Sequence, residues 1–271
     1  MLSPTKDVAP MRVSEAKLET NELFVDISNM KDLIMLNSKK EEKCNEECIV
    51  CEAPLVYLEK DELMECVLCH KKEFSKTRCQ NGHYVCNDCH TKGMDVIISM
   101  CLKEPSQNPI EIIRTMMNAS FCHMHGPEHH VMVGAALLTA YKNAGGNIEL
   151  KDALIEMMHR GKVVPGGACG FWGACGAGIS AGMFVSIISG STPLSTESWG
   201  LANKITSKAL DAIGSIGGPR CCKRDSYLSI LVAIEYVKEH FGIEMDSSDI
   251  QCSHYKQNNQ CIGNRCPFRN M

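Results

Sequence analysis

The C-terminal two-thirds of the chain carries apolar residues at helical spacing, with glycine-containing breaks between successive segments. The clearest case is residues 225–242, where Leu228, Leu231, Ile234 and Val237 fall on one stripe. This part of the chain shows no apolar–polar alternation long enough to indicate a strand. We therefore predict that it folds as an all-α domain.

Capping residues and glycines mark where these helices begin and end. Asn108 precedes Pro109, and proline suits the first position of a helix. Asn147 can cap the start of another helix, which Gly161 would end. We expect one helix that begins at Pro109. Five more are expected over residues 127–143, 147–161, 174–190, 195–214 and 225–242.

The N-terminal third has a different pattern. Residues 1–43 are polar and weakly patterned, which indicates an extension, whereas 44–90 combine paired cysteines with short β-like pieces at 55–58 and 72–74. We predict an α+β protein: a small zinc-knuckle module of treble-clef or RING-like type, followed by the helical domain. The predicted divisions are 1–43, 44–90, 91–250 and a cysteine-rich tail, 251–271, packed on the helical domain.

One uncharged run resembles a membrane span. Residues 163–196 hold no charged side chain, but the strongly apolar part is only Met183–Ile188. That length suits a buried helix rather than a bilayer. The first thirteen residues lack the apolar core of a signal peptide. We expect a cytoplasmic protein that does not cross a membrane.

The composition limits the classes of binding partner that we expect for this protein. The chain has 271 residues, 44% of them hydrophobic and 22% charged, as in an ordinary globular protein. The net charge of −4 and the 6% of aromatic residues disfavour nucleic-acid binding. A protein partner or a small-molecule substrate, neither of which the sequence identifies, remains the expectation.

Seventeen cysteines form two sets, and the first set is an array of close pairs. Such pairs present two ligands from one tight turn, and four ligands complete a tetrahedral zinc site. The array therefore predicts two zinc sites, joined either in the cross-braced order (first with third, second with fourth) or sequentially. Its members are Cys48, Cys51, Cys66, Cys69, Cys79, His83, Cys86 and Cys89.

The second set lies among glycines in the helical domain. Cys169 and Cys175 fall at a glycine-rich loop before a helix, where they could act as a redox dithiol. His125 and His129 stand at another helix start and are candidates for acid–base catalysis or metal binding. A second interpretation of the loop is close helix packing, because Ala174, Gly178 and Gly182 recur every four residues.

The tail adds three thiols, Cys252, Cys261 and Cys266, and the last is followed by proline as in ferredoxin-type clusters. Cys222 completes the candidate iron–sulfur set, and Cys221 is its alternative. A third zinc site is an equally strong interpretation of these residues.

The chain resembles a prokaryotic family known as domain of unknown function 5714. The resemblance rests on the array from Arg78 to His90, the block from Cys122 to His130, the loop 167–178 and the terminal Arg265–Phe268. It covers roughly residues 45–271 and implies a cytoplasmic metalloprotein. The family is found mainly in anaerobic prokaryotes, where oxygen-labile clusters are tolerated.

A second resemblance covers about residues 129–222. The glycine–cysteine loop, its helix and the later cysteine pair are similar to small proteins named for a Cys/GCAxxG/Cys/Cys pattern and regarded as redox-active. This chain has Ala174-Cys175-Gly176 in place of the Gly-Cys-Ala order, and a histidine in place of the early cysteine.

Three functional hypotheses follow. The first is a metalloprotein of redox or sulfur and cofactor metabolism, with an iron–sulfur cluster or a dithiol in the helical domain. The second is a non-catalytic zinc scaffold that recruits a protein or RNA. The third, for which the glycine-rich stretch 163–178 is the only indication, is a lyase with an exposed cluster iron.

Overall fold

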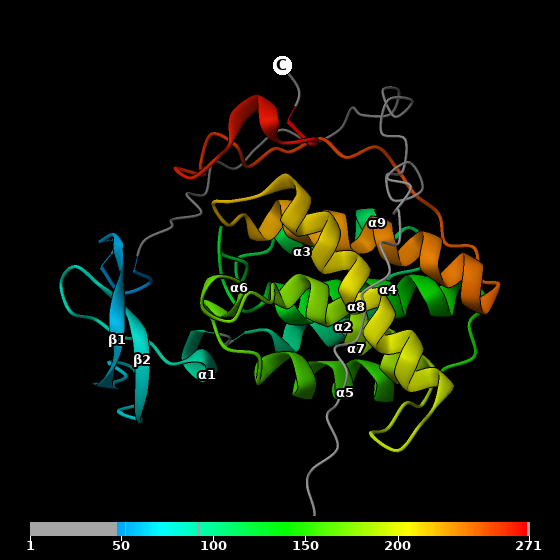
Figure 1. Ribbon diagram of the computed structural model, residues 1–271, viewed down its shortest axis with the longest axis horizontal. Helices are drawn as coiled ribbons and strands as arrows, with labels where there is room; N and C mark the ends of the chain where they lie inside the picture. The colour runs from blue at the N-terminus through cyan, green and yellow to red at the C-terminus, as the bar shows by residue number, and fades with distance from the viewer. Residues whose placement is uncertain (1–47, 52, 91–92, 270–271) are drawn as a thin grey trace, which may run out of the picture.

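The structure is a computed structural model that describes residues 48–51, 53–90 and 93–269. It consists of a small two-stranded part beside a larger helical part (Figure 1). The α+β class is therefore confirmed. The predicted extension at 1–43 lies outside the described residues. We call residues 48–90 the knuckle module, 93–250 the helical domain and 251–269 the tail.

The knuckle module is built on an antiparallel hairpin, β1 (Leu55–Glu65) and β2 (Lys72–Cys79). Leu55 pairs with Cys79, so the start of β1 lies beside the end of β2. A short helix, α1 (Asn87–His90), follows. The module's core is Met64, Tyr84 and three cysteines, which is too little apolar surface to hold a fold by itself.

The helical domain follows the pattern of apolar residues closely. Asn108 accepts a hydrogen bond from the Ile110 N–H at 3.0 Å, which confirms the predicted cap. The helices are α2 (Asp95–Lys103), α3 (Pro109–Met117), α4 (His129–Asn143), α5 (Leu150–Lys162), α6 (Ala168–Phe171), α7 (Gly176–Ile188), α8 (Glu197–Ile216) and α9 (Cys222–Phe241). A 3-10 turn, η2 (Gly263–Arg265), lies in the tail.

Helix α4 lies at the centre of this domain. Every residue from His129 to Tyr141 is buried, because α3, α5, α7 and α9 all pack against it. A helix that is apolar on all sides is stable only in such a central position. Helix α9 shares this burial over its first half. The charged side chains at the starts of α4 and α9 are therefore held inside the protein.

The tail crosses the helical domain on the side of α3 and α9 (Figure 1). Arg114 of α3 donates to the Asp249 carbonyl at 2.8 Å just before the tail. Within the tail, the Cys252 N–H donates to the Phe268 carbonyl at 2.7 Å. The Phe268 ring, 1% exposed, packs edge-on against Tyr227 of α9 at 5.5 Å. The tail is thus closed on itself and anchored to α9.

Helices α7 and α8 pack closely because α7 presents glycines to α8. A Cβ atom at Gly178 would lie 2.8 Å from Leu210 Cδ2, and one at Gly182 would collide with Thr206 Oγ1. The small-residue spacing noted in the sequence therefore has a packing role at these two positions.

Gly182→Ala should lower the free energy of unfolding by about 1–3 kcal/mol, because the added methyl group would force α7 and α8 apart. The control is Gly200→Ala, since a Cβ there meets nothing within 4 Å. That variant should gain about 0.5–1 kcal/mol from reduced backbone entropy in the unfolded chain. Urea unfolding of both variants checks the prediction; equal stabilities would contradict it.

Within the described part of the chain, no helix combines the length and the apolar character needed to cross a membrane.

Candidate functional site

The first knuckle site lies at the open end of the hairpin, where β1 starts and β2 ends. It consists of Cys48, Cys51, Cys79 and His83, whose donor atoms all lie within 4.8 Å of one another. Cys51 Sγ lies 3.8 Å from Cys79 Sγ and 3.1 Å from His83 Nδ1. For a zinc–sulfur bond of ~2.3 Å, the edge of a tetrahedron is about 3.8 Å. The four donors could therefore hold one metal ion.

The second knuckle site consists of Cys66, Cys69, Cys86 and Cys89, again with all donors within 4.8 Å. Cys69 Sγ and Cys86 Sγ are 3.5 Å apart, and the Cys86 N–H donates to Cys66 Sγ at 3.4 Å. The first cysteine pair thus meets the third, and the second meets the fourth. This is the cross-braced alternative of the two that the sequence leaves open.

One thiol of the first knuckle site is prepared for deprotonation. The backbone N–H of Ala53 hydrogen-bonds to the Cys51 sulfur, and this contact is the main reason why the pKa of Cys51 falls to about 6. Metal ligation requires the thiolate, so such an N–H favours the ligand form.

A cavity of about 520 Å³ separates the knuckle module from the helical domain. Besides Cys48 of the first knuckle site, three thiols line it, each from a different helix: Cys169 in α6, Cys175 at the N-cap of α7, and Cys222 as the first residue of α9. We call this space the interdomain cavity and these residues the cavity thiols. The glycine loop and Cys222 of the later cysteine pair, distant in sequence, therefore open onto one space.

Two of the cavity thiols, Cys175 and Cys222, are held in their neutral form. Burial, and then the negative charge of Asp225, raise the pKa of Cys175 to about 12. Cys175 Sγ lies 3.8 Å from Asp225 Oδ2. Burial also raises the pKa of Cys222 well above its ordinary value. A bound metal or an electron acceptor would have to supply the driving force for losing these protons.

The wall between the two parts of the protein is aromatic and cationic. Tyr57 of β1 meets Phe171 of α6 edge-on, with ring centroids 6.1 Å apart. The guanidinium of Arg220 lies 5.2 Å from the centroid of the Tyr57 ring. On the opposite side, a Cβ atom at Gly176 would collide with the His130 ring, so only glycine fits after Cys175. The knuckle module therefore forms one side of the cavity.

His125 faces this cavity beside Cys222. The Cys222 backbone N–H points at His125 Nδ1 across 3.4 Å. Burial, and then the charge of Arg220, lower the pKa of His125 to about 3. The imidazole is therefore neutral near pH 7 and suited to accepting a hydrogen bond or binding a metal, rather than to donating a proton.

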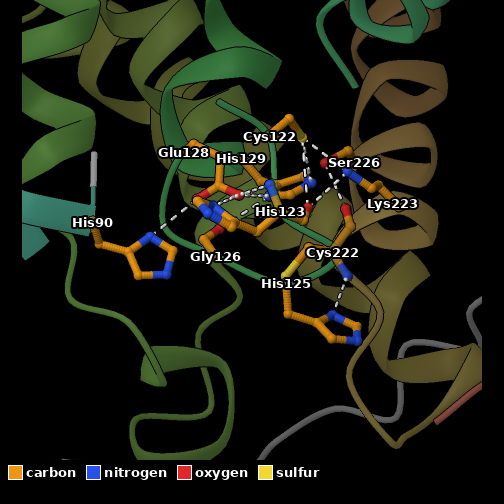
Figure 2. A network of polar contacts seen from close by, with 10 residues as sticks. All are labelled: His90, Cys122, His123, His125, Gly126, Glu128, His129, Cys222, Lys223 and Ser226. Atoms are coloured by element: carbon orange, nitrogen blue, oxygen red, sulfur yellow. Dashed lines mark hydrogen bonds and ion pairs between the residues drawn. The ribbon is translucent and has the colours of Figure 1, made fainter. Parts of the chain in front are cut away.

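His129 is buried in a network of polar contacts beside this cavity (Figure 2). Its Nδ1 lies 3.0 Å from the Gly126 carbonyl, and its Nε2 lies 3.7 Å from Cys122 Sγ. Burial lowers the pKa of His129. His129 is absent from the residues that line the interdomain cavity. Any part that it plays there is therefore indirect, through neighbouring side chains.

A carboxylate and an ammonium group complete this network (Figure 2). Glu128, 0% exposed, accepts a hydrogen bond from the His123 N–H at 2.8 Å. Lys223, also 0% exposed, donates to Cys122 Sγ and to the His123 carbonyl, each at 2.8 Å. Glu128 joins two groups of three donors, one with His90 and His123 and one with Cys122 and His129.

The Lys223 ammonium bears on whether the second group, Cys122, Glu128 and His129, could hold a metal ion. The positively charged ammonium lies 2.8 Å from Cys122 Sγ and already donates a hydrogen bond to this buried sulfur. A metal cation beside it would be repelled. We therefore interpret Cys122, Glu128, His129 and Lys223 as an internal charge network that fixes the starts of α4 and α9.

Comparison with protein families gives one match, to a family of unknown function designated DUF5714, over residues 97–269. The chain belongs to this family. No curated protein and no solved structure matches the chain. The match covers the helical domain and the tail and begins after the knuckle module, whereas the sequence resemblance was expected to start near residue 45. The matched segment of this chain includes the cavity thiols, the charge network and the tail cysteines.

The tail cysteines of this DUF5714 chain face a second, smaller cavity. Cys252, Cys261 and Cys266 line it together with Cys221, the N-cap of α9. Cys222, which we named as the fourth member of this set, lines the interdomain cavity instead. The two adjacent cysteines therefore open onto two different spaces.

Sequence reasoning missed Lys223 and Glu128 as buried groups, because such side chains are almost always on the surface. For Lys223, the sequence does contain a signal of burial. Three successive charged residues, Lys223 to Asp225, directly follow a cysteine pair and precede a strongly apolar helix. That position indicates a helix start turned toward the protein interior.

Proposed function

We propose that the chain is a redox metalloprotein in which two structural zinc ions order the knuckle module and the helical domain carries the redox chemistry. The observation that carries this proposal is the interdomain cavity, where three thiols from three helices converge beside His125. The ordered knuckle module closes the opposite side of that cavity. Metal binding to the knuckle module would therefore shape the cavity in which the redox chemistry takes place.

Zinc is the proposed metal of the knuckle sites for two reasons. One site offers three sulfurs and one imidazole and the other four sulfurs, which are the donor sets of structural zinc sites. The sulfur–sulfur separations of 3.8 and 3.5 Å are close to those around a single tetrahedral ion. The described cysteines are all free thiols, which suits a reducing compartment such as the cytoplasm.

The proposed chemistry at the interdomain cavity is reduction of a small molecule that contains a disulfide bond. Cys169 and Cys175 would each lose a hydrogen atom equivalent and become joined as a disulfide. The substrate would leave as two thiols, so two electrons and two protons are transferred in all. Tyr57 and Arg220 would hold the substrate against the thiols, and an iron–sulfur site in the same domain is the second part of the proposal.

Anaerobic purification followed by zinc, iron and sulfide analysis tests the metal content. Treatment with a small-molecule disulfide, then mass spectrometry, tests the dithiol. We expect a Cys169–Cys175 link in the wild type and in the Cys101→Ala control, which alters only a core thiol that is 1% exposed. Cys169→Ser should lose the link. A colourless, iron-free protein that forms no such link would overturn the proposal.

A non-catalytic zinc scaffold is the second candidate, and one observation favours it. Leu63 and Phe74 face each other across the hairpin and are 61% and 71% exposed. Such an apolar pair on a small module is typical of a protein-binding surface. This candidate predicts zinc without iron and unchanged behaviour of the Cys169→Ser variant, so the same measurements separate the two.

A further inference from the structure

The second cavity lies where the tail crosses the beginning of α9, and we call it the tail cavity. It encloses about 20 Å³ and has four cysteines in its lining. Cys221 comes from the N-cap of α9, and Cys252, Cys261 and Cys266 come from the tail (red in Figure 1). Four thiols around one closed space are enough ligands for a zinc ion or for an iron–sulfur cluster.

The separation of these thiols distinguishes the two occupants. Within the described residues, the knuckle sites are groups whose donors lie within 4.8 Å of one another, and no such group includes a tail-cavity cysteine. A single ion needs all four sulfurs around one point. A cluster needs them farther apart, because its ligands bind different iron atoms. The wider spacing therefore favours a cluster.

A buried cation also points to an anionic occupant. Arg224 is 3% exposed and lines the tail cavity. Its Nε donates to Asp225 Oδ1 at 2.9 Å and one terminal nitrogen donates to the Pro219 carbonyl at 3.3 Å. Among the described residues, its Nη1 has no hydrogen-bond partner. An unpaired buried donor is costly, and sulfur atoms of a negatively charged cluster would satisfy it.

Backbone and side-chain donors already surround the sulfurs. The N–H groups of Arg224, His254 and Phe268 hydrogen-bond to Cys221, Cys252 and Cys266, respectively. The Asn258 amide also lies 3.5 Å from Cys221 Sγ. Donors directed at thiolate sulfur stabilise iron–sulfur clusters and raise their reduction potentials. The N-terminus of α9, a helix of 20 residues, adds its positive dipole end at Cys221.

We infer that Cys221, Cys252, Cys261 and Cys266 bind an iron–sulfur cluster in the tail cavity, with Arg224 as a donor to it. This inference specifies the iron–sulfur part of the proposed function, on which it rests. It assigns Cys221, rather than Cys222, as the ligand from α9. Because these two residues are adjacent, the cluster lies one peptide unit from a thiol of the interdomain cavity.

The test uses the full chain, purified without oxygen and reconstituted with ferrous iron and sulfide. We expect bound iron and sulfide in equal amounts, with visible absorption that dithionite bleaches. Cys221→Ser and Cys266→Ser should lose the bound iron. Cys222→Ser is the matched control, since it changes the adjacent thiol, and should keep it. Arg224→Gln should keep the iron but lower the reduction potential, because a positive hydrogen-bond donor is lost.

The outcomes separate this inference from the proposed function. Loss of iron in Cys222→Ser with retention in Cys221→Ser would overturn the ligand assignment. Iron that Cys221→Ser and Cys266→Ser both retain, or a third zinc in place of iron, would overturn the cluster. In either case, an intact Cys169–Cys175 link would leave the dithiol part of the proposed function standing. Circular dichroism and zinc content show that each variant is folded.

Discussion

Replacing Cys86 by serine should remove at least one of the two proposed zinc equivalents and unfold the knuckle module. Cys86 is 0% exposed and lies 3.5 Å from Cys69 Sγ at the second knuckle site. Zinc contributes about 10–16 kcal/mol to the folding of comparable small domains. Because the module's own core holds only a few residues, nothing else can replace that contribution. Zinc analysis and limited proteolysis of the full chain measure both effects.

The matched control for this variant is His70→Asn. His70 follows Cys69 directly, but its side chain is 76% exposed and belongs to neither knuckle site. Its φ of 62° is tolerated by asparagine better than by most residues. This control should retain two zinc equivalents and resist protease. A Cys86→Ser protein with the zinc content of the control would show that the second knuckle site holds no structural metal.

Loss of the knuckle module should also open the interdomain cavity. Tyr57 contacts Phe171 and Arg220 across the boundary, so the module supplies one aromatic wall. The cavity thiols would then face solvent on that side. The consequence is that the knuckle sites, one of which borders the cavity through Cys48 and His83, would determine whether the cavity is closed to water.

Local features of the fold were predictable because they depend on neighbours in sequence. The cap at Asn108 and the apolar stripe of α9 each involve residues within a few positions of one another. The paired cysteines of the knuckle sites were visible for the same reason. The order in which the pairs meet depends instead on the hairpin register, Leu55 with Cys79, which no local pattern encodes.

The division between Cys221 and Cys222 could not be predicted for a related reason. The apolar stripe begins at Leu228, so the sequence placed the helix start near Asp225, whereas α9 begins at Cys222. Once the helix starts there, adjacent residues at the N-cap and first position point in different directions. One thiol faces the tail and the other the interdomain cavity.

The early start of α9 also buries Lys223. Replacing this residue should have the second large effect on stability. Lys223→Met should lower the free energy of unfolding by about 3–5 kcal/mol, because two buried acceptors would lose their charged donor, at a cost of about 1–3 kcal/mol each. Its ammonium donates to Cys122 Sγ and to the His123 carbonyl, each at 2.8 Å. Methionine has a similar length, so the change removes charge and hydrogen bonds more than volume.

The control for Lys223→Met is Lys204→Met on the exposed side of α8, which should change stability by no more than about 0.5 kcal/mol. Urea unfolding compares the two variants. A second measurement follows the His129 ring by NMR: burial and the Lys223 charge lower its pKa, so that pKa should rise in Lys223→Met. Equal stability of both variants with an unmoved His129 titration would mean that the ammonium adds nothing to the stability of the network, and the starts of α4 and α9 would then be held by packing alone.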